Sequence, residues 1–277
     1  MGSAIALRLH REGIPVAAWN RSAQRSEAVA AEGVSVAADP AAAIRPAEII
    51  LLTLSDMAAI EATLLAPSQA TLIAGKTVVQ MSTISPEESH EVCQYVREQS
   101  GRYLEAPVLG SIPEALAGKL IVMAGGEPVD YERSLPLLRH LGEDVQLIGE
   151  VGQAAALKLA MNQLIAGLTA TFALSLGLVR SQGIRVEQFM GLLRKSALYA
   201  PTFDKKLSKY LEHDYATANF PLRHLLKDIR LFQQVAEPLG LDAALSNAMA
   251  DACERGIRAG HGDQDYSSIY EALTERG

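Results

Sequence analysis

The first half of the chain alternates short uncharged runs with stretches of helical spacing, and this alternation limits the possible folds more than any other feature. Residues 49–54 and 77–81 contain no charge, which is typical of central strands buried on both faces. Together the runs predict an α/β fold, a Rossmann-type doubly wound parallel sheet with crossover helices. The further strands are expected at 16–19, 34–36, 121–124 and 145–147, with helices at 5–12 and 26–32.

Beyond residue 150 the spacing is helical throughout. Helices are expected at 186–195, 202–212, 222–238 and 243–259. A chain of 277 residues is long enough for two domains, which we expect over 1–150 and 151–277. The uncharged segment 164–179 is shorter than the ~20 residues of a membrane span. We expect it to be a buried helix between the domains, and we expect no membrane association.

Composition excludes several classes of function. A net charge of −7 and a pI near 5.4 argue against nucleic-acid binding, which requires a basic face. The two cysteines, Cys93 and Cys253, and the six histidines are scattered without the spacing of metal ligands. The polar segment 262–270 is interpreted as a loop and helix cap, not a metal site. With no signal peptide visible, we expect a cytoplasmic protein that acts on small molecules.

Polar residues follow two of the predicted strands, where doubly wound sheets bind ligands. Asn20, Arg21 and Ser22 come after the strand at 16–19, and Leu54 and Ser55 close the strand at 49–54. An NAD site would have an acidic residue near the first position, to bind the ribose hydroxyls. Here a guanidinium and a hydroxyl suit a 2′-phosphate, so the sequence predicts NADP. The alternative is a solvated basic turn.

The chain begins at the point where such a fold needs its phosphate-binding turn. Gly2 would be the last glycine of a G-x-G-x-x-G turn, which binds a pyrophosphate at a helix N-terminus. We therefore expect Met1 to be an internal methionine, preceded by a short apolar strand that ends in Gly-x-Gly.

A lysine and an asparagine lie one turn apart in the apolar helix that begins near Gly152. Lys158 and Asn162 share a face, and both can donate a hydrogen bond to a carbonyl oxygen. Lysine is rarely buried unless it is paired. The alternative is that Lys158 extends to solvent from the helix edge.

Several short motifs occur in one order along the whole chain. With them, the sequence resembles the beta-hydroxyacid dehydrogenase family of 3-hydroxyisobutyrate dehydrogenases and of glyoxylate, tartronate semialdehyde and succinic semialdehyde reductases. The motifs that carry the resemblance are Met1-Gly2, Asn20-Arg21-Ser22, Met81-Ser82-Thr83, residues 105–111, residues 152–162, and Phe220-Pro221-Leu222-Arg223-His224 followed by Lys227-Asp228.

The resemblance implies an NADP-dependent oxidoreductase acting on CH–OH groups. Its expected reaction is the NADPH-dependent reduction of a small semialdehyde or glyoxylate to the hydroxy acid. The first domain would bind the cofactor, and the helical second domain would bind substrate and form a homodimer or homotetramer.

The resemblance also assigns roles to single residues. Lys158 is the expected catalytic acid, Asn162 a substrate ligand, and Asp228 the residue that holds Lys158 in place and keeps it protonated. Phe220 would form an apolar wall of the site. The remaining substrate positions are Thr83, Leu109, Gly110 and Ser111, and the remaining cofactor positions are Gly2, Asn20, Arg21, Ser22, Leu54, Ser55, Thr83 and Lys227.

Leu109 departs from the family pattern and leaves the substrate open. The family usually has a serine there, which hydrogen-bonds the substrate carboxylate; leucine cannot. An imine reductase is an alternative, since an imine needs no carboxylate pocket, although those relatives generally replace the lysine found here at Lys158. A non-catalytic, cofactor-poor binding protein is the other alternative.

Overall fold

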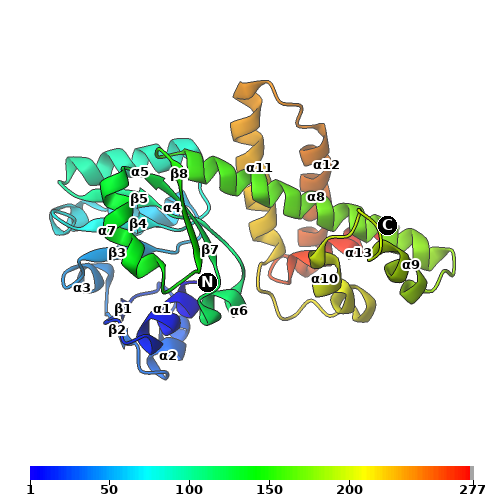
Figure 1. The fold of residues 1–277 in the computed structure, drawn as a ribbon, viewed down its shortest axis with the longest axis horizontal. Coiled ribbons are helices and arrows are strands. Elements are labelled where there is room, and N and C mark those ends of the chain that lie inside the picture. Colours follow the sequence, from blue (N-terminus) through cyan, green and yellow to red (C-terminus); the bar gives the residue numbers. More distant parts are fainter. Residues whose placement is uncertain (275–277) are drawn as a thin grey trace. The chain divides into compact units, whose positions relative to one another are not determined.

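The computed structural model describes residues 1–274 and divides the chain into two compact units, Met1–Lys158 and Leu159–Gly277. The boundary falls inside the long helix α8 (Gln153–Ser181). The first unit is the α/β part of the fold (Figure 1). Its elements are α1 (Gly2–Arg11), β1 (Ala17–Ala18), α2 (Ala23–Ala30), β2 (Ser35–Val36), α3 (Pro40–Ile44), β3 (Ile49–Leu52), α4 (Met57–Ile60), β4 (Thr77–Gln80), α5 (Pro86–Glu98), β5 (Arg102–Glu105), β6 (Val108–Leu109), α6 (Ile112–Ala117), β7 (Ile121–Gly126), α7 (Pro128–Leu138) and β8 (Asp144–Gly149).

The strands of the first unit form two sheets. β1 and β2 pair in parallel as a two-stranded sheet. The six-stranded sheet has the order β3-β4-β5-β7-β6, with β8 also paired to β7. The pairs β3–β4 and β7–β8 are parallel, as the crossover pattern predicted. The pair β4–β5 is parallel too, although the strand β5 was not predicted. The predicted α/β class is thereby confirmed.

The sheet is mixed and not parallel throughout, because β7 runs antiparallel to both β5 and β6. The connection from β6 to β7 contains only the short helix α6, and a parallel return needs a crossover of about a dozen residues or more. The motif at residues 105–111, which includes three expected substrate positions, begins at the last residue of β5 and contains β6. Leu109 is therefore a strand residue, paired with Ile121.

The two uncharged runs, residues 49–54 and 77–81, were both predicted to be strands buried on both faces, and only the second is. β4 is buried at every position, as predicted. In β3 burial alternates: Ile50 and Leu52 are buried, while Ile49 and Leu51 are half-buried. Among the described strands β3 pairs with β4 only, so it is an edge strand of this sheet and not the central strand predicted.

The second unit is all-helical, as predicted. α11 (Leu222–Ala236) and α12 (Ala244–Gly256) pack side by side, and their core includes Ala166, Leu225 and Cys253 (Figure 1). A second core surrounds Phe172, whose ring stacks on Phe203 at 4.5 Å. Besides the rest of α8, the helices are α9 (Val186–Leu193), α10 (Pro201–Glu212), α11 (Leu222–Ala236), α12 (Ala244–Gly256) and α13 (Ile269–Thr274).

Residues 164–179 were predicted to form a buried helix, and they are part of the partly exposed helix α8. It has 29 residues, so by length and composition it could cross a membrane, and only 33% of its most apolar window is buried. Leu164 and Leu178 are 61% and 63% exposed, and Leu168 and Leu174 are exposed too. The segment is therefore not a fully buried helix within this chain. On the same helix, Phe172 and Leu176 are buried in the core of the second unit.

The polar segment near the C-terminus is a loop and cap, as predicted, and it also forms an unpredicted buried ion pair. Asp265 accepts a hydrogen bond from the Ser267 amide at the start of a 3-10 helix, Tyr266–Ser268. Its two carboxylate oxygens lie 2.8 and 2.7 Å from Lys206 Nζ, and Lys206 is only 5% exposed. Burial lowers the pKa of Lys206, and the Asp265 charge opposes that shift.

Candidate active site

The turn after β1 carries the residues predicted to bind a cofactor phosphate. Asn20, Arg21 and Ser22 are all exposed, and Asn20 Oδ1 accepts a hydrogen bond of 2.8 Å from the Ser22 amide. Ser22 is also the N-cap residue of α2. The side chains of Arg21 and Ser22 thus project from an ordered turn at the carboxyl end of a strand.

The start of α1 lies beside the carboxyl end of β3. A Cβ atom on Gly2 would overlap Thr53 Oγ1, so a larger residue here would require the Thr53 side chain to move. Burial lowers the pKa of the Met1 amino group, and the charge of Arg25, which lies near this end of α1, lowers it further. Helix N–H groups and a guanidinium both favour an anion. These residues fit the pyrophosphate of a dinucleotide.

Hydrogen bonds connect the ends of β3 and β4. The Leu54 amide donates to Ser82 Oγ over 2.8 Å. The buried Gln80 side chain holds the Ser82 backbone at both its N–H and its carbonyl. Ser82 is thereby fixed, and Thr83, half-buried, follows it directly. Leu54 and Thr83, both predicted ligand positions, thus lie at the hydrogen-bonded carboxyl ends of β3 and β4.

Gly110 and Ser111 form the turn between β6 and α6. Gly110 has a φ of 120°, and a Cβ there would lie 2.7 Å from Leu120 Cδ2. The Ser111 hydroxyl donates to Glu114 Oε2 at 2.5 Å, within a capping box for α6. Leu109, half-buried, precedes them. Ser111 therefore caps α6, and its role in substrate binding stays a prediction.

Helix α8 carries the two predicted donors. Lys158 is half-buried, and Asn162 is only 4% exposed. Asn162 Nδ2 donates to Asp228 Oδ2 over 2.6 Å, and Lys227 Nζ lies 2.8 Å from Asp228 Oδ1. Asp228 was predicted to hold Lys158 in place. Within the second unit, the partners of this buried carboxylate are Asn162 and Lys227.

The contact with Asp228 determines what Asn162 can offer a ligand. An ionised carboxylate only accepts hydrogen bonds, so the NH₂ end of the amide must face it. The carbonyl Oδ1 and the second N–H of Asn162 then point elsewhere. In this orientation Asn162 can both accept a hydrogen bond from a ligand, at Oδ1, and donate one to it, from the second N–H.

Phe220 lies in the segment just before α11. The Tyr266 amide donates to its carbonyl over 2.9 Å, and the two rings are 5.6 Å apart. Tyr266 was not predicted as a neighbour of Phe220, because nothing local in the sequence connects the two segments.

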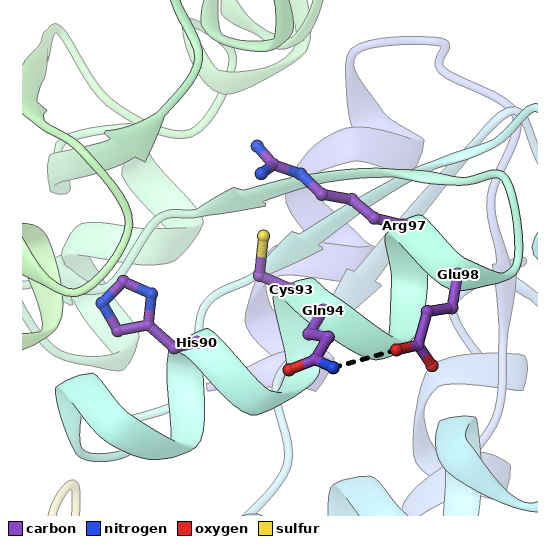
Figure 2. Close-up of a pocket in the computed structure, with 5 residues that line it drawn as sticks. All are labelled: His90, Cys93, Gln94, Arg97 and Glu98. Carbon is purple, nitrogen blue, oxygen red and sulfur yellow. Dashed lines mark hydrogen bonds between the residues drawn. The ribbon is translucent and has the colours of Figure 1, made fainter.

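A separate hollow of about 520 Å³ lies on α5 and contains none of the predicted site residues. Figure 2 shows its lining, His90, Cys93, Gln94, Arg97 and Glu98. Burial raises the pKa of the Cys93 thiol, against the opposing charge of Arg97. A protonated thiol is a poor nucleophile, so Cys93 is not suited to nucleophilic catalysis here. Within residues 1–274, no cluster of three His, Cys, Asp or Glu side chains could hold a metal.

Comparison with known proteins matches both halves of the chain. Residues 1–149 match the family described as the NAD binding domain of 6-phosphogluconate dehydrogenase. Residues 152–273 match the family described as NAD-binding of NADP-dependent 3-hydroxyisobutyrate dehydrogenase. Glyoxylate/succinic semialdehyde reductase 1 of Arabidopsis thaliana is 29% identical over 275 residues, which cover 99% of this chain and 95% of that protein.

Solved structures share the fold over nearly the whole chain. A 3-hydroxyisobutyrate dehydrogenase from Salmonella typhimurium has a TM-score of 0.87 and 23% identity, covering 98% of this chain and 95% of the other. Psf3 in complex with NADP+ and 2-OPP has a TM-score of 0.90 and 24% identity, covering 99% and 96%.

Proposed function

Because this chain belongs to the beta-hydroxyacid dehydrogenase family and is an NAD(P)-dependent oxidoreductase, we propose that it uses NADPH to reduce a small semialdehyde or glyoxylate to the hydroxy acid. The observation that carries the proposal is on α8, where Lys158 precedes Asn162 by one turn and Asn162 is oriented by the buried Asp228. A binding protein without catalysis has no use for this arrangement. The name of the Arabidopsis reductase supports the substrate class.

The proposed chemistry divides between the cofactor and the side chains of α8. Bound NADPH would supply the hydride. Lys158 would donate a proton to the carbonyl oxygen, and its positive charge would stabilise the negative charge that develops there. Asn162, fixed by Asp228, would orient the substrate by hydrogen bonds without competing for the proton. Phe220 would exclude water from one side of the substrate.

The substrate is tested by following NADPH oxidation with glyoxylate, succinic semialdehyde, tartronate semialdehyde, an uncharged aldehyde and a cyclic imine. We expect turnover of the aldehydes and none of the imine. Leu109 should weaken the requirement for a nearby carboxylate, so longer aldehydes are expected to compete with glyoxylate. Leu109→Ser should lower the KM for glyoxylate. An unchanged KM would mean that other groups bind the carboxylate, and turnover of the imine alone would favour the imine reductase alternative.

We propose NADP over NAD because Arg21 and Ser22 project from the turn after β1. NADPH is expected to exceed NADH at least tenfold in kcat/KM, about 1.4 kcal/mol for a charge-assisted contact. Arg21→Asp should weaken NADPH use far more than NADH use. Arg139→Asp, at another exposed arginine, is the control and should change neither. Equal use of the two cofactors by the unmodified protein would contradict the proposal.

We also propose that the exposed apolar stripe of α8, formed by Leu164, Leu168, Leu174 and Leu178, is covered by a second copy of the chain. An exposed apolar face of this length is typical of an oligomer interface. A membrane location is disfavoured, because α8 packs into the core of the second unit and carries the buried Asn162, which donates a hydrogen bond to Asp228 of α11. The expected assembly is a dimer or tetramer.

Light scattering coupled to size exclusion tests the stripe. Leu164→Glu combined with Leu168→Glu should lower the molar mass to that of a smaller assembly, because two charges would be buried at the interface. Leu192→Glu, at an exposed leucine outside the stripe, should leave the mass unchanged. A monomeric unmodified protein, or a double variant of unchanged mass, would contradict this interface.

A further inference from the structure

Glu105, the last residue of β5, is a fully buried carboxylate at 0% exposure. Its Oε1 accepts hydrogen bonds from the backbone amides of Ala154, at 2.8 Å, and Ala155, at 3.2 Å. These amides lie in the first turn of α8, where helix N–H groups have no partner within the helix. A negative charge is also favourable at this end of a helix.

Two further contacts hold the carboxylate in place. Ser89, on α5, donates its hydroxyl proton to Glu105 Oε2 and lies 2.8 Å from the Tyr103 hydroxyl. Burial raises the pKa of Tyr103 well above its usual value, so its O–H remains to donate to Ser89. On β7, a Cβ atom at Gly125 would overlap Glu105 Oε1. The carboxylate is thus enclosed by α5, β7 and the start of α8.

Capping alone does not explain a buried charge at this position. Helices α5 and α6 are capped locally, by Glu88 and Glu114 three residues after their N-caps. Glu105 is 49 residues away from Ala154 and belongs to the sheet. Its hydrogen bonds therefore fix the first turn of α8 relative to β5, in addition to satisfying the amides. Lys158 follows Ala154 by one helical turn.

We propose that Glu105 is a positioning residue for Lys158. By anchoring the first turn of α8 to the end of β5, it sets where the Lys158 ammonium lies relative to the carboxyl edge of the sheet. This inference rests on the proposed function, in which Lys158 is the proton donor. A misplacement of a catalytic group by about 1 Å can lower the rate ~10²-fold, so the anchor matters for turnover.

The test compares Glu105→Ala and Glu105→Gln with Glu88→Gln. Glu105→Ala is expected to lower kcat by about 10- to 100-fold, with the Kd for NADPH within about twofold of the unmodified value. Glu105→Gln keeps an oxygen acceptor but loses the charge, which roughly halves hydrogen-bond strength, so about a threefold loss is expected. Glu88→Gln, at a carboxylate that caps α5, should leave kcat nearly unchanged.

A double-mutant cycle with Lys158→Ala separates positioning from a general loss of structure. If Glu105 acts through Lys158, changing it in the Lys158→Ala background should cause no further loss of kcat. An equal loss in both backgrounds, or kcat within about twofold of normal for Glu105→Ala, would overturn the inference. Should Glu105→Ala fail to fold, Glu105→Gln completes the cycle. If Lys158→Ala itself keeps normal turnover, the proposed function has failed, and the inference fails with it.

Discussion

Lys158→Ala is expected to lower kcat by about 10²-fold or more, the usual scale for the loss of a general acid. The variant would also lose the positive charge that stabilises the developing oxyanion. NADPH binding should change little, because the predicted cofactor contacts come from residues such as Gly2, Arg21 and Leu54. Steady-state kinetics with the best aldehyde of the screen, together with a fluorescence titration of NADPH, would measure both effects.

Lys195→Ala is the matched control for this experiment, since Lys195 is an exposed lysine of the second unit. It should keep normal turnover. A folded Lys158→Ala protein that also turned over normally would remove the proposed mechanism. Asp228→Asn should give a smaller loss than Lys158→Ala, because its expected effect is on the orientation of Asn162 and not on the proton donor itself.

Lys206→Met is expected to give the largest loss of stability, about 3 to 5 kcal/mol in the free energy of unfolding. The substitution removes the ammonium from the fully buried Asp265 carboxylate and leaves it the N–H and O–H of Ser267, at 3.2 and 2.7 Å. The ammonium also lies 4.4 Å above the Tyr266 ring, a contact that would be lost too. Urea denaturation of both proteins would measure the difference.

The reason for that loss can be tested with a second substitution. Lys206→Met combined with Asp265→Asn should be less destabilising than Lys206→Met alone, since no uncompensated charge would then be buried. Arg194→Met is the control, because Arg194 forms a solvent-exposed ion pair with Asp204 and its loss should change stability little. If Lys206→Met were as mild as Arg194→Met, the buried pair would not contribute as proposed.

The strands and helices with a strong local pattern could be predicted from the sequence. The uncharged run at β4 and the helical spacing of α9 to α12 led to the right elements within a few residues. β5 and β6 were missed, because residues 102–109 include Arg102 and the buried Glu105 and so lack the pattern of a strand. Glu105 is stable there only because amides 49 residues away bind its carboxylate.

In the candidate site, too, some residues could be predicted from the sequence and some contacts could not. Lys158 and Asn162 could be found by their spacing alone, since residues one turn apart share a helix face. The partners of Asp228 could not, because Asn162 lies 66 residues away from it in the chain. The same holds for the Lys206–Asp265 pair, whose members are 59 residues apart.

Local periodicity and residue chemistry in the sequence thus determined the α/β and all-helical halves, the basic turn after β1 and the lysine–asparagine pair of α8. Tertiary structure alone decided the antiparallel direction of β7, the exposure of the α8 leucines and the partners of the buried charges. The physical reason is that periodicity depends on neighbouring residues in the chain. Strand direction and charge pairing depend on which distant segments meet, and the desolvation of a charge is offset only where those segments supply its partners.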